Sequence, residues 1–332
     1  MKLFIKKLYY YVKQAAYVYH IDTDLSYEKE RLSANAIRLT HAIEKGLCVS
    51  NPRKGFGKEK IHDILKTINR IITIDSDFIN STHFLMVYDA LSEYVEWHKK
   101  QQYSDELVLE VTEWVNNNRY LRANKPTERF GGTLRYTKHT FDESAIEKLF
   151  NNRHSCRTYL NEEIDHALLE KAISLANRYP SACNRQAVRL HIVNHNRTDC
   201  IKHWFGNNKS FWNDAKEFIM VCAKVSSYVP DEYQQYEVSA GIYVGYLTLA
   251  LQTYGIGCCV IQREVLNTDD FRQFAKELNI PGDEQLICLI ACGMEPNEYL
   301  VPISHRLSAK EMTHYCDMDS KGRMKNSHPP HD

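Results

Sequence analysis

Apolar residues recur at helical spacing through the first third of the chain. In the segment from Leu32 to Leu47 (LSANAIRLTHAIEKGL) they fall three or four residues apart, which is the repeat of one helical face. The segments 61–74 and 84–98 repeat this pattern, and no long alternation typical of a strand interrupts them. Gly46 predicts the end of the first of these helices. The pattern therefore predicts a helical region over residues 26–118.

The pattern changes over residues 119–140. Pro126 and Gly131 interrupt regular structure there and basic residues dominate, so we expect a linker or a loop. Beyond it, helical periods alternate with short apolar runs typical of buried strands, and Asp142 and Asp165 are suited to cap helices. The alternation favours an α/β or α+β architecture. The expected strands lie at 189–195, 217–225, 257–262 and 284–293.

Composition and charge narrow the class of protein. The 332 residues include 42 Lys plus Arg and 42 Asp plus Glu, so the formal net charge is zero. A generic electrostatic nucleic-acid binder needs a surplus of positive charge, and we expect none here. Mean hydropathy is −0.48, and no apolar run approaches the ~18 residues of a membrane span.

The cysteines predict reduced thiols in a cytoplasmic protein. Most of the ten cysteines stand in apolar segments, and no pair has the C-x-x-C spacing of a zinc site, so we expect no metal site.

The two ends of the chain carry different signals. The first twenty residues are rich in tyrosine and lysine, contain no acidic residue and lack the continuous apolar core of a signal peptide. They favour a helix that docks on the rest of the protein, although lysines and apolar residues that segregate on a helix would also suit a membrane surface. The polar residues 311–332 predict a flexible tail.

Two polar clusters carry the candidate chemistry. The first, Arg153–Arg157 (RHSCR), places two guanidinium groups, a hydroxyl and an imidazole within five residues, which suits a phosphate dianion. The second, Pro180–Gln186 (PSACNRQ), lies between a helix and a strand, where small residues allow a flat ligand to approach and amides can read a heterocycle. Each cluster alone is also compatible with an ordinary solvated loop or turn.

Together, R-H-S-x-R followed by P-S-A-x-N-x-Q before a strand resembles the FMN-dependent nitroreductase family. The resemblance continues in further segments and covers about residues 141–310. These segments are Asn208 ahead of an apolar strand, the long helix with its Gly-x-Gly strand over 237–262, the segment 284–296, and Ile303–Leu307. The sequence departs from the family pattern at Ala187, Gln262 and Ser304, which affects the expected substrate more than the expected cofactor.

The resemblance implies a fold and an assembly. The fold is α+β and nitroreductase-like, with a central, mostly antiparallel sheet flanked by helices, and an N-terminal helical region is added to it. The family implies a homodimer that holds FMN at the subunit interface. The expected parts are a helical region over 1–118, a linker over 119–140, an FMN-binding domain over 141–310 and a flexible tail over 311–332.

The resemblance also implies roles for individual residues. The phosphate and ribityl chain of FMN are expected to be held by Arg153, His154, Ser155 and Arg157, and Arg306 is expected to add positive charge. The partner subunit is expected to reach the flavin through Pro180, Ser181, Ala182 and Asn184. Asn208 is expected to bond the edge of the flavin ring. The region of the flavin near N5 is expected to be lined by Val260, Ile261 and Gln262. No side chain is expected to be catalytic, because the flavin carries the chemistry.

The implied activity is a ping-pong hydride transfer from NAD(P)H through FMN to an electron-poor acceptor, such as a nitro compound or a quinone. Two alternatives remain open at this point. The first is a flavin enzyme that does not use NAD(P)H. The second is an FMN-binding module whose N-terminal region docks on a membrane or on a partner in surface-polysaccharide synthesis.

A motif in the N-terminal region bears on the second alternative. The segment His41–Leu47 (HAIEKGL), followed by Gly55-Phe56-Gly57, resembles the extension on nitroreductase-like proteins that are linked to bacterial surface-polysaccharide synthesis. His41, Glu44 and Lys45 are three and four residues apart on one helix, so they also suit simple pairing. We assign no catalytic role to them.

Overall fold

The computed structural model describes residues 2–123, 125–206, 210–232, 234–262, 269–314, 317–318 and 324–325. By its internal contacts the chain divides into two units, Met1–Asn297 and Glu298–Asp332. The predicted Asn208 lies outside the described residues.

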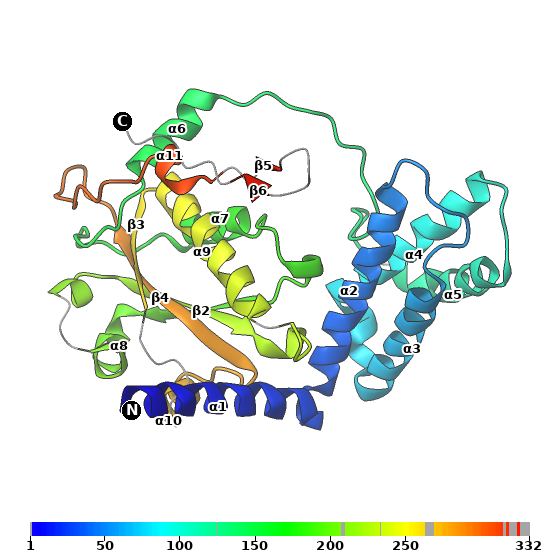
Figure 1. Ribbon diagram of the computed structural model, residues 1–332, viewed down its shortest axis with the longest axis horizontal. Helices are drawn as coiled ribbons and strands as arrows, with labels where there is room; N and C mark the ends of the chain where they lie inside the picture. Colours follow the sequence, from blue (N-terminus) through cyan, green and yellow to red (C-terminus); the bar gives the residue numbers. More distant parts are fainter. Residues whose placement is uncertain are drawn as a thin grey trace. The chain divides into compact units, whose positions relative to one another are not determined.

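The N-terminal region is helical, as its apolar period predicts. Its elements are α1 (Lys2–Thr23), η1 (Leu25–Tyr27), α2 (Glu28–Cys48), α3 (Lys58–Ile74), η2 (Ser76–Asn80), α4 (Thr82–Lys100) and α5 (Glu106–Ala123) (Figure 1). Side chains of α2, α3, α4 and α5 share one buried core, in which Ile43, Ile64 and Phe84 are fully buried. Helix α2 continues to Cys48 and does not end at Gly46. Gly46 instead makes room for the ring of Phe56, which a Cβ would approach to 2.2 Å.

A four-stranded antiparallel sheet forms the centre of the C-terminal half. The strands are β1 (Val188–Asn194), β2 (Glu217–Lys224), β3 (Ile256–Ile261) and β4 (Glu284–Met294), in the order β1-β2-β4-β3. All three neighbouring pairs are antiparallel, and the register shifts between Val221 and Cys222 where β2 meets β4. With helices flanking this sheet, the predicted α+β fold with a central antiparallel sheet is confirmed.

The helices of this half follow the predicted alternation. They are α6 (Glu143–Asn152), α7 (His166–Ala176), α8 (Thr198–Phe205), α9 (Gln235–Thr253) and α10 (Asp269–Glu277), with short turns η3 (Ala182–Asn184), η4 (His195–Arg197), η5 (Ser210–Trp212) and η6 (Val225–Ser227). Asp142 and Asp165 cap α6 and α7 as predicted, because each carboxylate accepts a backbone N–H of its helix. Side chains of α7 and α9 pack with Ile219 and Val221 of β2 in one buried cluster.

Helix α1 docks on this half through its second part. The Gln14 amide donates to the hydroxyl of Tyr236 and to the side chain of Gln285, each at 2.7 Å, and the Tyr17 hydroxyl donates to the Gly282 carbonyl at 3.0 Å. These contacts agree with the docking role that the sequence favours for this helix. Among the described residues, no helix has both the length and the apolar character needed to cross a membrane.

Residues 298–332 form the second unit. It contains α11 (Ala309–Met312), β5 (Asp317–Met318) and β6 (Met324–Lys325). Ser308 caps α11 in a reciprocal arrangement with Glu311, whose carboxylate accepts the Ser308 backbone N–H. Arg306 belongs to this unit and donates to the Ser304 carbonyl at 2.8 Å.

Candidate functional site

The first polar cluster begins where α6 ends. Arg153 is the C-cap of α6, and the chain then runs beside the outer strand of the sheet. The Cys156 N–H donates to the Cys258 carbonyl at 2.9 Å, and Ser155 forms a single parallel bridge with Cys258. The cluster is therefore fixed along the β3 edge, beside the predicted Val260 and Ile261.

Two glycines allow this close approach. A Cβ on Gly257 would lie 2.7 Å from the Cys156 sulfur, and a Cβ on Gly293 would lie 2.7 Å from the Tyr159 side chain. Gly257 and Gly293 are paired across β3 and β4. The Tyr159 hydroxyl lies 2.9 Å from the Cys156 carbonyl oxygen, and burial raises the Tyr159 pKa above its ordinary value. Cys156 is thus a packing residue, buried against the sheet.

The cluster presents donors that the protein itself leaves available. Within the described part of the chain, no hydrogen bond engages the Arg153 guanidinium or the Ser155 hydroxyl, and both residues are half-buried. Arg157 is exposed and donates only to the nearby Ser155 carbonyl, at 3.3 Å, while His154 Nδ1 lies 2.7 Å from the Asn152 carbonyl oxygen. Burial raises the Cys258 pKa to about 12, although the positive charge of Arg153 acts in the opposite direction. This set of cationic and hydroxyl donors fits a phosphate dianion.

The second cluster forms a strained turn between α7 and β1. Cys183, Asn184 and Gln186 have φ values of 51°, 55° and 48°, in the left-handed region that side chains seldom adopt. Ser181 holds the turn together, because its carbonyl accepts the Asn184 N–H and its hydroxyl accepts the Gln186 N–H, at 3.0 and 3.1 Å. Such strain persists where the surroundings over-determine a conformation, which is common at ligand sites.

Arg185 anchors this turn, and the sequence analysis did not single it out. Its guanidinium is buried and donates twice to the Glu232 carboxylate, at 2.6 Å each, and once to the Ser227 carbonyl at 2.9 Å. It also lies 4.2 Å from the centre of the Tyr228 ring. The Arg185 hydrogen bonds lower the Glu232 pKa. The partners are about 40 residues downstream, so no local spacing could have revealed the anchor.

The two clusters lie at opposite corners of the sheet. Ser155 is beside Cys258, which is level with Cys292 and, on β2, with Glu217. The second cluster enters the sheet at Val188, at the other end of the other outer strand. Four strand spacings, counted from β1 to the segment outside β3, and most of a strand length separate them, or roughly 28 Å. Within one chain the structure therefore does not bring the two clusters together.

The other predicted contacts have different surroundings. Val260 is about one-third exposed on β3, Ile261 is buried and Gln262 is exposed just after the strand. Pro180 is exposed, whereas Ser181, Ala182 and Asn184 are half-buried.

A groove lies beside the second cluster, between α7, α9 and β1. Its volume is about 380 Å³. Apolar and aromatic side chains form most of its wall, and Gln186 brings the second cluster to its rim. The lining includes Ile173, Asn177, Tyr179, Gln186, Val188 and Tyr243. A mostly apolar groove with a few polar groups is typical of a small-molecule site.

The motif in the N-terminal region has a structural explanation. His41 Nδ1 lies 3.0 Å from one Glu44 oxygen, which is the predicted pairing, and the other oxygen accepts the Gly132 N–H at 2.9 Å. The Phe56 carbonyl accepts the Tyr94 hydroxyl, and His98 Nε2 accepts the Gly55 N–H. The motif therefore shapes a surface of the helical region that holds another part of the chain.

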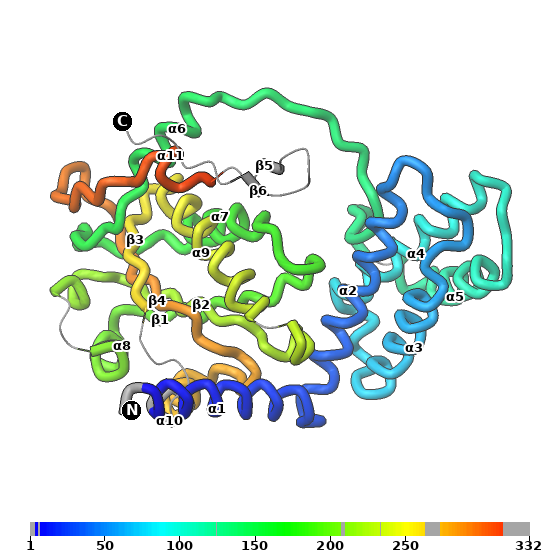
Figure 2. The backbone as a smooth tube through the Cα atoms, in the orientation of Figure 1, coloured from blue at the N-terminus to red at the C-terminus, as the bar shows by residue number. Residues whose placement is uncertain are grey.

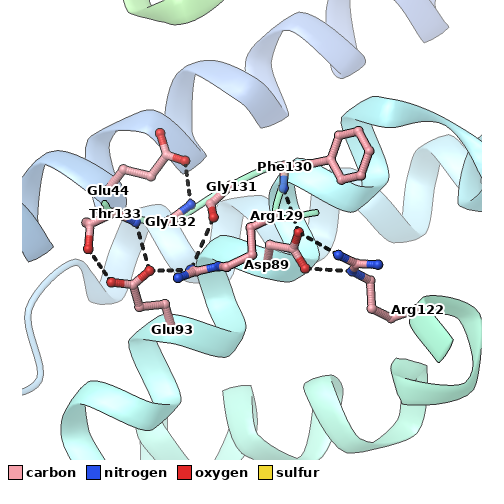
Figure 3. A network of polar contacts seen from close by, with 9 residues as sticks. All are labelled: Glu44, Asp89, Glu93, Arg122, Arg129, Phe130, Gly131, Gly132 and Thr133. Atoms are coloured by element: carbon pink, nitrogen blue, oxygen red, sulfur yellow. Dashed lines mark hydrogen bonds and ion pairs between the residues drawn. The ribbon is translucent and has the colours of Figure 1, made fainter. Parts of the chain in front are cut away.

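That part is the segment 126–133 (Figure 3). The Phe130 N–H donates to Asp89 and the Thr133 N–H donates to Glu93, at 2.8 Å each, so three carboxylates accept backbone donors from one extended segment. Arg122 pairs with Asp89 and Arg129 with Glu93. A Cβ on Gly131 would lie 2.1 Å from the Met86 carbonyl oxygen, so only glycine fits. We name residues 126–133 with these carboxylates the linker clamp. Beyond it, residues 134–142 cross to α6 as an exposed connection (Figure 2).

The C-terminal half is similar to a known protein family. Residues 151–200 and 198–294 match the sequence model described as the nitroreductase family. No curated protein matches the sequence.

Solved structures are similar to about half of the chain. A Desulfovibrio desulfuricans protein in complex with FMN is 19% identical, over 54% of this chain and 100% of that one, with a TM-score of 0.45. An FMN-dependent nitroreductase from Clostridium difficile is 20% identical, over 51% and 98%, with a TM-score of 0.43. A nitroreductase family protein from Streptococcus pneumoniae is 21% identical, over 51% and 99%, with a TM-score of 0.42.

The family match spans both polar clusters, the four strands of the sheet and the helices between them. Residues 151–294 of this chain therefore match the nitroreductase family.

Proposed function

We propose that the chain is an FMN-dependent oxidoreductase that takes electrons from NAD(P)H and reduces an electron-poor acceptor, such as a nitro compound or a quinone. The observation that carries the proposal is the set of available donors at Arg153, Ser155 and Arg157 beside β3, within a region that matches the nitroreductase family. Bound FMN would supply the hydride-transfer chemistry, which is the cofactor's own.

The protein's part is to bind and to orient. Arg153 and Arg157 would hold the phosphate through charge-assisted bonds, and Ser155 would add a neutral donor. Bonding of Ser155 and Cys156 to β3 fixes these side chains relative to Val260, which lines the expected ring position. The Arg185 anchor would present Asn184 in a fixed orientation. Arg306 and Asn208 retain the roles that the resemblance implies, as proposals.

A homodimer would complete the site. The two clusters are about 28 Å apart in one chain at β-sheet spacings, so a ligand bound by both must lie between two subunits. Helix α9 supports this, because Val238, Ile242 and Tyr246 expose an apolar stripe one helical face wide. Gly241 and Gly245 lie on the same face, and a Cβ on either would meet only open space. A second copy could therefore approach α9 closely.

The decisive experiment is spectroscopic. We expect the purified full-length chain to be yellow, to release FMN on denaturation, and to lose its visible flavin bands when NADH or NADPH is added without oxygen. A colourless chain that cannot be loaded with FMN would refute the proposal. A yellow chain that is reduced by dithionite and by neither nicotinamide would refute the NAD(P)H step and favour a flavin enzyme with another electron source.

The dimer has its own test. Ile242→Asp places a charge in the middle of the exposed stripe of α9, and we expect it to shift the protein from dimer to monomer in sedimentation. We expect FMN to be lost with it, because the two clusters then no longer meet. The control is Leu109→Asp, which changes an exposed leucine on α5 and should leave a dimer. A monomeric wild type that binds FMN would contradict the shared site.

A further inference from the structure

Three side chains that can bind a metal meet near the start of β4. They are His191 of β1, Cys222 of β2 and Glu284 of β4, and their ligand atoms all lie within 4.8 Å of one another. His191 Nε2 is 2.6 Å from a Glu284 carboxylate oxygen. The three residues are far apart in the sequence and come together only through the β1-β2-β4 order, so no local spacing motif could reveal them.

The burial of these groups is unusual for an ion pair alone. The Glu284 side chain is 6% exposed, the His191 side chain is 25% exposed and Cys222 is fully buried. A buried carboxylate needs a compensating positive charge, which a protonated His191 could supply on its own. The pairing of His191 with Glu284 does not explain why the Cys222 thiol lies beside both groups.

A nucleophilic cysteine does not account for the cluster. Cys222 is closed to any substrate, and burial and the nearby Glu284 charge raise its pKa well above its ordinary value. A reactive cysteine instead needs a lowered pKa and partial exposure. A bound cation reverses this situation, because it replaces the thiol proton and makes the thiolate the favoured form.

We propose that His191, Cys222 and Glu284 bind a zinc ion. Imidazole nitrogen, thiolate sulfur and carboxylate oxygen are the three donor types that zinc takes in proteins. Zinc bonds of about 2.0–2.3 Å at tetrahedral angles separate ligand atoms by roughly 3.3–3.6 Å. The His191–Glu284 pair would therefore open slightly from 2.6 Å, and no separation in the cluster exceeds 4.8 Å. One thiolate and one carboxylate balance the charge of Zn²⁺, so the buried site would be neutral. Calcium and magnesium prefer oxygen ligands and do not suit this set.

The site also has an entry path and a structural consequence. The His191 side chain is 25% exposed, so zinc would enter from its side, and three protein ligands would leave the fourth position to water. The proton of the Cys222 thiol passes to solvent when zinc binds. The ion would cross-link the outer strand β1 to β2 and β4. Zinc binds only the folded arrangement, so it would stabilise the fold by mass action. Under this proposal, the expectation of no metal site from the sequence does not hold.

Metal analysis of the full-length chain tests the site. The protein is loaded with Zn²⁺, passed over a chelating resin and analysed for zinc per chain, and its affinity is measured by competition with a chromophoric chelator. We expect one zinc per wild-type chain. His191→Ala and Cys222→Ser should each lower the affinity by more than ~100-fold, because loss of an outer-shell partner alone costs 10- to 100-fold. Cys288→Ser, which changes a buried thiol of β4 outside the cluster, should keep the zinc.

Two outcomes would overturn the proposal. One is a wild-type chain that holds no zinc after loading. The other is a zinc affinity that His191→Ala and Cys222→Ser both leave unchanged, which would place the metal elsewhere. His191 is partly exposed on an outer strand, so its variant is expected to fold, and far-ultraviolet circular dichroism checks this. Zinc is counted whether or not the chain carries flavin, so failure of the proposed oxidoreductase activity would leave this result intact.

Discussion

The polar side chains of the linker clamp and those of the first polar cluster differ in whether the protein itself supplies their partners. In the linker clamp, Glu44, Asp89 and Glu93 each accept a backbone N–H and each pair with a cationic or imidazole side chain. In the sheet region, the Arg153 guanidinium and the Ser155 hydroxyl have no hydrogen-bond partner among the described residues.

Two groups of glycines differ in the same way. Gly131 is pressed against the backbone of α4, whereas Gly241 and Gly245 of α9 face open space beside the exposed Ile242. Protein interiors satisfy their polar groups and fill their volume. A network in which every polar group has a partner therefore indicates a structural role. Open donors and an apolar stripe indicate that another molecule completes the surface. Under the proposed function, the linker clamp holds the chain together, whereas the first polar cluster and α9 would bind a ligand and a second copy.

The largest expected effect is on FMN affinity, when the arginines of the first polar cluster are removed. Arg153→Ala combined with Arg157→Ala should weaken FMN binding by about 10²–10⁴-fold, because each lost charge-assisted contact is worth roughly 1.5–3 kcal/mol. Fluorescence titration of the flavin-free protein measures this. Arg119→Ala, an exposed arginine of α5, is the matched control and should bind FMN as the wild type does. Equal FMN affinity in the double variant would remove the cluster from the site.

The next effect is on the linker clamp. Asp89→Ala removes the carboxylate that pairs with the half-buried Arg122 guanidinium and accepts the Phe130 N–H, and we expect a loss of about 3–5 kcal/mol in unfolding free energy. Urea unfolding followed by circular dichroism measures the loss. Asp63→Ala, on the exposed side of α3, should change stability by less than ~0.5 kcal/mol. A loss that small at Asp89 would mean that the clamp is not structural.

Much of the fold could be predicted because it depends on local signals. The spacing of apolar residues located the helices and strands. Asp142 and Asp165 marked helix starts because each caps its helix through a side-chain hydrogen bond that spans only two or three residues. The stop assigned to Gly46 was wrong because a glycine also serves where a neighbour packs closely, here the Phe56 ring. The two meanings look identical in a sequence.

The candidate site was predicted in part. The polar clusters could be recognised because the donors of each lie within a few residues of one another. Arg185 could not, because its acceptor Glu232 reaches it only through the turn and η6. The linker clamp was equally hidden, since Glu44 and Gly132 are far apart in sequence. Contacts of this kind are set by tertiary structure, and one sequence carries no local trace of them.

The Arg185 anchor predicts a pH dependence. Arg185 lowers the folded-state pKa of Glu232 below its ordinary 4.5. Its stabilising contribution is therefore fully present above pH 4.5 and is lost as the pH falls through the lower, folded-state pKa. Glu232→Gln should cost about 1.5–3 kcal/mol near neutral pH, and the gap to the wild type should close in acid. Urea unfolding at several pH values measures the gap. A gap that is constant down to acid pH would rule out the charge as its cause.

The smallest expected effect comes from a variant that tests the close packing of Gly131 against α4. Gly131→Ala places a methyl group where the Met86 carbonyl oxygen of α4 already lies, so the segment 126–133 must lift away from the helical region. Overpacking of this kind costs roughly 1–3 kcal/mol, which corresponds to about a 5- to 150-fold faster hydrogen exchange at the amides of Phe130 and Thr133. Mass spectrometry of peptides covering 126–133 measures this rate. Gly241→Ala meets no neighbouring atom within 4 Å and should leave those amides unchanged. If Gly131→Ala also left them unchanged, the segment would be held by its backbone donors alone, and the close approach to α4 would be incidental to the clamp.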